Sequence, residues 1–103
     1  MKKFKNDKER IAFLEDYRNE DNGWYLWIEN NDIDRRWWRY DLPDCALIVE
    51  EQLQTFTWPN SEQKWHVHKW FIIQDWHRPF ADGSASRSLA LIELKRCEKE
   101  MKE

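Results

Sequence analysis

The sequence predicts an α+β fold: a helix, a four-stranded antiparallel meander and a second helix, with both helices on one face of the sheet. Three observations predict it. Apolar residues near both ends of the chain recur at helical spacing, whereas the central part is rich in aromatic and β-branched residues. The turns between the predicted strands are short, which requires antiparallel pairing. A chain of 103 residues has the usual size of one domain, so we expect residues 1–103 to form a single domain.

The first predicted helix covers residues 7–20. Asn6 stands three residues before Glu9, the pattern of a capping box in which both side chains satisfy free backbone N–H groups. An apolar stripe at helical spacing follows, formed by Phe13, Leu14 and Tyr17. Asn22-Gly23 tolerates positive φ and is the expected stop signal.

Four strands are predicted in the central part of the chain. Their expected ranges are Trp24–Glu29, Arg35–Leu42, Cys45 or Ala46 to Thr57, and Lys64–Gln74. Aromatic and β-branched residues favour this conformation. In the second strand, alternation places Trp37 and Arg39 on one face and Trp38 and Tyr40 on the other.

Two turns that contain proline join the later strands. They cover residues 42–45 and 58–61, and in each the proline stands where a φ near −65° is wanted. A loop over residues 75–83 then leads to the last helix.

The last predicted helix covers residues 87–99, with Ser84 or Ser86 as its cap. Its buried face is expected to consist of Ala90, Leu94, Cys97 and Met101. Leu89 and Ile92 point elsewhere, so either the preceding loop covers this flank or the helix offers an apolar contact to another molecule. A two-fold homodimer is one possible use of that contact.

Aromatic residues make up 16% of the chain, which has eight tryptophans. Disordered chains are poor in aromatics, so the high charged fraction of 36% does not indicate disorder. Tryptophan is rarely buried completely. We therefore expect some of the tryptophans to lie partly exposed, on the sheet face away from the helices.

No apolar run is long enough to span a bilayer, and the start of the chain is charged, unlike a signal peptide. We expect a cytoplasmic protein without membrane contact. Cys45 and Cys97 lie far apart in the sequence and form no C-x-x-C pair. In a cytosolic chain such cysteines are expected to be buried thiols.

The negative charges are concentrated in two stretches. Residues 15–34 contain seven carboxylates and one cation, Arg18, and residues 41–62 contain five carboxylates and no cation. An ordinary solvated surface is one explanation. The other is an acidic face that meets a basic partner, with Glu29, Asp32 and Asp34 as its rim.

The segment Arg35-Arg36-Trp37-Trp38-Arg39 interleaves cations and aromatic rings. Such a pattern can stack nucleic-acid bases while it holds phosphates. Trp and Arg are also the residues most often found as anchors in protein interfaces. The third explanation is structural, with one strand face in the core and the arginines stacked over the other. Arg35, Arg36, Trp37, Trp38 and Arg39 are the candidate anchors of a protein interface.

Motifs of catalysis are absent from the sequence. There is no nucleophile motif, and two glycines in the whole chain cannot make a glycine-rich phosphate loop. His66 and His68 lie two residues apart in a predicted strand and are weak candidates for a metal site, which needs further ligands. We expect no catalytic residues and no cofactor.

The layout of the chain is similar to that of a double-stranded-RNA-binding domain at Gly83-Ser84-Ala85-Ser86-Arg87-Ser88-Leu89-Ala90, which matches the start of that family's last helix. Arg87 is the only basic residue there, so the RNA-gripping charges do not carry over. In size, acidity and Trp content, and at Gly23-Trp24-Tyr25-Leu26-Trp27 and Arg36-Trp37-Trp38-Arg39, the chain also resembles small uncharacterised proteins encoded by bacterial phages and mobile elements. That resemblance implies an accessory or anti-defence role and transfers no functional residue.

Three functions follow from these observations. The first is a non-catalytic accessory or inhibitory protein that occupies the basic surface of a partner, such as a nucleic-acid-processing enzyme. The second is a nucleic-acid-binding module, which the net charge of −3 disfavours. The third is a metal protein or enzyme that uses His66 and His68.

Overall fold

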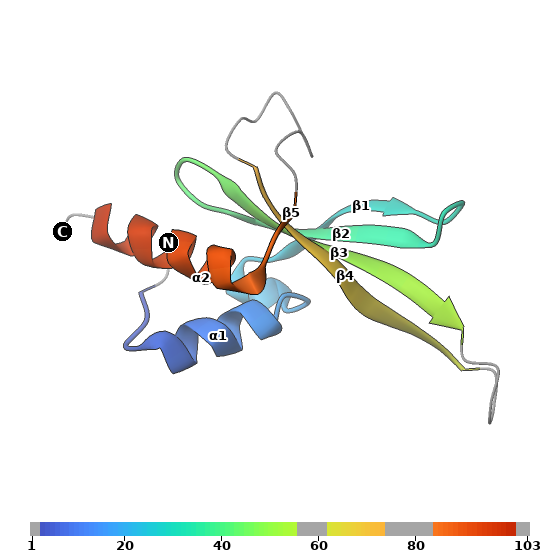
Figure 1. Cartoon of the computed structure of the whole chain (residues 1–103), viewed down its shortest axis with the longest axis horizontal. Coiled ribbons are helices and arrows are strands. Elements are labelled where there is room, and N and C mark those ends of the chain that lie inside the picture. Colours follow the sequence, from blue (N-terminus) through green and yellow to red (C-terminus); the bar gives the residue numbers. More distant parts are fainter. Residues whose placement is uncertain (1–2, 56–61, 74–83, 101–103) are drawn as a thin grey trace.

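A computed structural model of the chain describes residues 3–55, 62–73 and 84–100 and has the predicted α+β fold (Figure 1). Its elements are α1 (Asp7–Glu15), the short 3-10 helix η1 (Glu20–Asn22), β1 (Tyr25–Asn30), β2 (Arg35–Asp41), β3 (Ala46–Thr55), β4 (Gln63–Ile73), β5 (Ser84–Ala85) and α2 (Arg87–Glu100). The predicted order of a helix, four strands and a helix is confirmed. The two-residue β5 was not predicted.

The strands form one antiparallel sheet in the order β1-β2-β3-β4-β5. Consecutive strands are neighbours, as expected for a meander. Strand β1 is therefore an edge strand, hydrogen-bonded to β2 on one side only. Its ladder with β2 shifts register between Leu26 and Ile28, and such irregularities are common at sheet edges.

Helix α1 is shorter than predicted. Asn6 caps it by accepting a hydrogen bond from the backbone N–H of Glu9 at 3.0 Å. The Glu9 carboxylate accepts from the backbone N–H of Lys5, where a capping box would use that of Asn6. The helix ends at Glu15, because the next residues turn away from the helix axis and lead into η1. Neither helix of the described residues is long and apolar enough to cross a membrane.

Gly23 is the stop signal that the sequence predicted, although it closes η1 and not a long first helix. Its φ of 97° lies in the left-handed region. A Cβ atom at this position would lie 3.0 Å from the Tyr40 ring, so both the backbone conformation and the space favour glycine.

The turn over residues 42–45 is closed by a hydrogen bond from the Leu42 N–H to the Cys45 carbonyl at 2.8 Å. At the start of α2, Ser86 is the cap and accepts from the Leu89 N–H at 3.2 Å, whereas Ser84 lies in β5. The predicted turn at residues 58–61, the predicted loop at 75–83 and Met101 lie outside the described residues.

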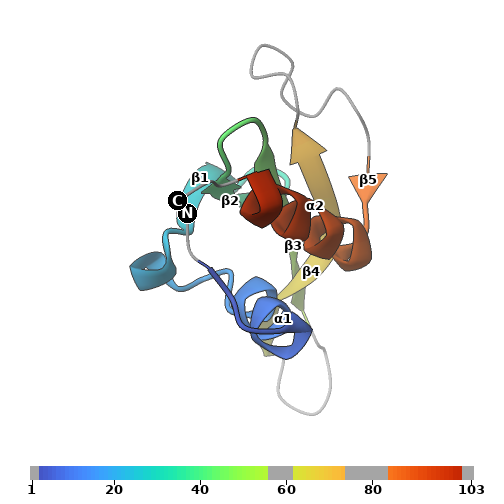
Figure 2. The same cartoon turned by 90° about the vertical axis from the view of Figure 1, so that its left-hand side faces the viewer.

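Both helices cover the same face of the sheet, as predicted (Figure 2). Their buried residues join one core cluster with side chains from β2 and β3. That cluster consists of Phe13, Leu14, Tyr17, Trp24, Trp38, Tyr40, Leu42, Cys45, Leu47, Val49, Ala90, Leu94 and Cys97. The prediction that Ala90, Leu94 and Cys97 form the buried face of the last helix is therefore confirmed.

The opposite face of the sheet carries a second, smaller cluster. Its buried members are Ala46, Ile48 and Ile73, with the half-buried rings of Trp27, Trp37 and Phe71 packed around them. Some of the expected partly exposed aromatic residues thus lie on the sheet face that the helices leave uncovered, whereas Trp70, also partly exposed, packs against the main core cluster.

Candidate functional site

Two adjacent glutamates of β3 hold the Arg-Trp segment of β2, one glutamate on each face of the sheet. Glu50 lies on the face without helices, where it accepts hydrogen bonds from Arg35 Nη1 and from Trp37 Nε1, both at 3.0 Å. Glu51 is the equivalent residue on the helix-covered face. Neighbouring strand residues point to opposite faces, so each face needs its own carboxylate for its own Arg and Trp.

Glu51 is completely buried and accepts hydrogen bonds from four side chains. Arg36 Nε lies 2.6 Å and Trp38 Nε1 2.7 Å from its Oε1, while Tyr17 and Arg18 bind its Oε2. Burial acts to raise the pKa of this carboxyl, but the hydrogen bonds from these four side chains outweigh burial and hold the pKa below its ordinary value. The arrangement stabilises the fold.

Two of the predicted anchors are not available to a partner. Trp38 is only 9% exposed and packs in the main core. Arg39 is 8% exposed, because its guanidinium stacks 4.6 Å from the Trp27 ring and its Nε donates to Asp41 at 2.7 Å. Trp38 and Arg39 are therefore buried in this structure, which leaves neither side chain on the surface.

The other three predicted anchors are half-buried and already engaged. Arg35 and Trp37 bind Glu50. Arg36 binds Glu51 and stacks 4.2 Å from the Trp65 ring. This segment is thus mainly a structural device, the third of the explanations that the sequence left open.

The predicted acidic rim, in contrast, is on the surface. Glu29 is the last residue but one of β1, and Asp32 and Asp34 lie in the turn between β1 and β2 (Figure 1). All three are exposed, as are Glu20 and Asp21 in η1 at the other end of β1. Within residues 3–55, 62–73 and 84–100, these five carboxylates form no ion pair.

Exposed apolar side chains lie in the same stretch of the chain as these carboxylates, two in β1 and one in the turn that follows it. Tyr25 is 37%, Leu26 38% and Ile33 54% exposed. The turn that carries Ile33 is ordered by the hydrogen bond from the Asp32 N–H to Asn30 Oδ1 at 3.0 Å. We call the surface formed by Glu20, Asp21, Tyr25, Leu26, Glu29, Asp32, Ile33 and Asp34 the acidic edge.

The turn at the end of the acidic edge has a fixed backbone. Asp34 adopts a positive φ of 54°, a conformation that aspartate tolerates better than most residues. Its carbonyl accepts a hydrogen bond from the Leu53 N–H at 2.9 Å, which ties the turn to β3. Ile33 therefore lies in a turn whose backbone is fixed by hydrogen bonds.

Among the described residues, the structure does not bring His66 and His68 into a group of possible metal ligands. The ladder between β3 and β4 shifts register between Glu50 and Glu51, which leaves His68 without an opposite residue and interrupts the alternation on which the prediction rested. His68 Nε2 lies 3.6 Å from Glu50 Oε2. Neither histidine belongs to the one group of side chains in the described part of the chain that lie close enough together to hold a metal ion.

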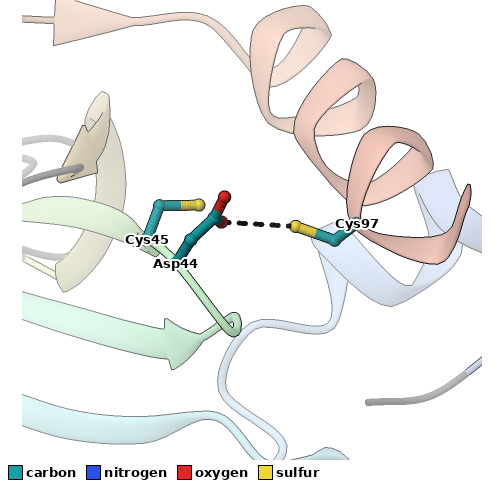
Figure 3. Close-up of side chains that lie close together, drawn as sticks. All are labelled: Asp44, Cys45 and Cys97. Atoms are coloured by element: carbon teal, nitrogen blue, oxygen red, sulfur yellow. Dashed lines mark hydrogen bonds between the residues drawn. The ribbon is translucent and has the colours of Figure 1, made fainter. Parts of the chain in front are cut away.

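That group consists of Asp44, Cys45 and Cys97, which the sequence did not reveal as a site (Figure 3). Their ligand atoms all lie within 4.8 Å of one another. Both thiols are buried, as predicted, and burial raises the pKa of Cys45 to about 12. The only sequence signal was the placement of Cys97 on the buried helix face, because no motif spacing connects it to Cys45.

No protein-family model matches the chain, and comparisons with curated proteins and with solved structures find no match either. The function is therefore argued from the surfaces of this chain alone.

Proposed function

We propose that this chain is a small non-catalytic binding protein whose acidic edge meets the basic surface of a partner protein. One observation supports this proposal above the others. Five exposed carboxylates without an ion pair to a described residue lie along one edge of the fold, together with two exposed apolar side chains on the edge strand β1 and a third, Ile33, in the turn that follows it.

Among the described residues, several other surface carboxylates contact an arginine of the chain itself, such as Asp44 with Arg96 at 2.9 Å and Glu15 with Arg87 at 2.6 Å. Such contacts reduce the negative potential that a partner would meet. Glu9 and Asp16 form no ion pair with a described residue either, but they are not part of the acidic edge. The acidic edge keeps its potential, which accelerates association with a basic surface.

The apolar residues supply the short-range part of the interaction. Charges at the rim of an interface mainly steer association, whereas buried aromatic and aliphatic anchors hold the complex together. Tyr25, Leu26 and Ile33 replace the predicted anchors Trp38 and Arg39 in this role. The remaining predicted anchors stabilise the fold through Glu50 and Glu51; they are Arg35, Arg36 and Trp37.

The same arrangement suits an inhibitory or accessory role. The two groups of carboxylates lie at opposite ends of β1, whose six residues span about 20 Å. A negative surface of this length competes with a nucleic-acid backbone for the cations of a nucleic-acid-processing enzyme. An anti-defence protein that blocks such an enzyme is the form of this proposal that we favour.

Direct binding of nucleic acid by this chain is less well supported. A nucleic-acid site needs cations that are available to phosphates. The arginines of β2 are engaged with the carboxylates of Glu50, Glu51 and Asp41. The Arg87 side chain, at the start of the last helix, contacts Glu15.

A site-specific crosslinking experiment tests the proposal. A photoreactive residue placed at Ile33 should capture a basic protein in cells that encode the chain, while the same residue at Val67, exposed on β4, should not. The captured protein is then purified and its affinity measured.

Charge variants decide whether the acidic edge is responsible. The triple variant Glu29→Gln/Asp32→Asn/Asp34→Asn should bind the captured protein more weakly than the parent. The matched control, Glu62→Gln, removes an exposed carboxylate elsewhere and should bind as the parent does. Equal binding by the triple variant and the parent would contradict the proposal. So would saturable binding of duplex RNA or DNA by the pure chain at physiological salt.

A further inference from the structure

The turn between β2 and β3 meets the second half of α2 at a cluster of thiols and carboxylates. Figure 3 shows Asp44 and Cys45 on the turn facing Cys97 on the helix. Cys97 Sγ lies 3.7 Å from Asp44 Oδ1, and the ligand atoms of all three residues lie within 4.8 Å of one another. Both thiols are almost completely buried, with exposures of 0% and 2%.

These separations are close to those of a tetrahedral zinc site. With Zn–S near 2.3 Å and Zn–O near 2.1 Å, tetrahedral angles separate a sulfur from an oxygen by roughly 3.6 Å and two sulfurs by roughly 3.8 Å. The Cys97–Asp44 separation already matches the first value. No separation in the cluster exceeds 4.8 Å, so none needs to shorten by more than about 1 Å, which side-chain rotation can provide.

Glu93 is the candidate for a fourth ligand, although it lies outside the group whose ligand atoms are all within 4.8 Å of one another. Glu93 lies one helical turn before Cys97 on α2, and its Oε2 is 4.0 Å from Cys45 Sγ. Residues four apart on a helix share a face, so Glu93 and Cys97 both point toward the turn. Two thiolates and two carboxylate oxygens complete a tetrahedral set.

Arg96 supplies the charge and the orientation that such a site needs. Its guanidinium donates to both oxygens of Asp44 at 2.9 and 3.0 Å and to Glu93 Oε2 at 2.6 Å. Two thiolates and two carboxylates carry more negative charge than Zn²⁺ neutralises, and Arg96 offsets part of the excess. Hydrogen-bonding partners behind metal ligands fix their orientation in known sites.

We propose that Asp44, Cys45, Cys97 and Glu93 bind one zinc ion that ties the β2–β3 turn to α2. Thiolate sulfur excludes calcium and magnesium as the preferred ions, because these favour sets of oxygen ligands. All four positions are filled by protein, which is typical of a structural zinc site. On binding, the two thiol protons leave to solvent and no electron is transferred. This site is separate from the acidic edge and stands independently of the proposed function.

Cobalt(II) is the spectroscopic probe for the site. The whole chain, kept under a thiol-free reductant and stripped with a chelator, should bind one Co²⁺ and gain the thiolate-to-cobalt and tetrahedral d–d absorption bands. Zn²⁺ should displace the cobalt stoichiometrically and protect both thiols from alkylation. A parent chain that folds but gains no thiolate-to-cobalt absorption would overturn the proposal.

Variants locate the ligands. Cys97→Ser should abolish the thiolate-to-cobalt absorption. Asp44→Asn should weaken zinc binding by roughly tenfold or more, because mutation of residues that only hydrogen-bond to metal ligands already lowers metal affinity by about 10–100-fold. Asp41→Asn is the matched control, because it removes a carboxylate at the end of β2 outside the cluster and should leave binding unchanged. Should Cys97→Ser fail to fold by circular dichroism, Asp44→Asn and Glu93→Gln decide the question. Unchanged zinc affinity in both overturns the site.

Discussion

The indole N–H of Trp38 donates a hydrogen bond to Oε1 of Glu51 at 2.7 Å, in the interior between the sheet and the helices. One residue earlier in each strand, Trp37 makes the same contact with Glu50 at 3.0 Å on the other face. This duplication explains why paired arginines, tryptophans and glutamates stand next to one another in the sequence. Each face of the sheet has its own set.

Loss of the Glu51 charge should strongly destabilise the protein. In Glu51→Gln, the Arg18 and Arg36 guanidinium groups lose the carboxylate that neutralises them. Breaking a buried ion pair costs about 3–5 kcal/mol, and we expect a decrease of about 3 kcal/mol in the free energy of unfolding by denaturant. The control Glu29→Gln, an exposed carboxylate of the same sheet, should change it by about 0.5 kcal/mol or less. Similar values for both variants would contradict this assignment.

The same carboxylate should make the protein sensitive to acid. Its pKa in the folded protein lies below the ordinary value of 4.5. The stabilisation by ionised Glu51 is therefore fully present above about pH 4.5 and is lost as the pH falls toward the folded pKa. Unfolding by urea at a series of pH values should show this loss in the parent and a shallower dependence in Glu51→Gln. Parallel pH profiles for the two proteins would contradict the prediction.

Trp38 and Trp37 should differ in what their removal does. Trp38→Ala empties part of the main core and should cost about 3–5 kcal/mol of unfolding free energy. Trp37 is half-buried at the smaller cluster, so Trp37→Ala should cost at least about 1 kcal/mol less. Denaturant titrations of both variants measure the difference. A larger loss of unfolding free energy for Trp37→Ala than for Trp38→Ala would contradict the assignment of Trp38 to the main core.

Local patterns were enough to predict the strands and the acidic rim. Alternation correctly separated Trp37 from Trp38, because the period of a strand is a property of its backbone. The exposure of Glu29, Asp32 and Asp34 was also predictable, since charged residues in a polar turn rarely become buried.

The features that depend on distant residues were not predictable. The first helix ends early, and Tyr17 and Arg18 then bind Glu51, which lies more than thirty positions away in the sequence. The burial of Arg39 depends on Trp27 in the neighbouring strand. The approach of Cys97 to Asp44 depends on how α2 crosses the sheet, and no local spacing encodes that crossing.

The exposed side of α2 supports the earlier prediction of a dimer. Leu89 is 47% and Ile92 55% exposed, and the two lie one helical turn apart. We expect the parent chain to sediment as a two-fold dimer and Leu89→Lys/Ile92→Lys to sediment at the monomer mass of 12.9 kDa. A parent chain that remains monomeric at high concentration would exclude this use of the helix.

Stopped-flow measurement of association tests most directly the claim that the acidic edge binds a basic partner. The rate at which the chain associates with the protein captured at Ile33 is measured over a range of salt concentrations. For the parent chain the rate should fall steeply as salt rises, because salt screens the attraction between the acidic edge and a basic partner. Glu29→Gln/Asp32→Asn/Asp34→Asn should associate more slowly at low salt and depend less on salt. Equal rates and equal salt dependence for the two proteins would contradict the assignment of the acidic edge as the binding surface.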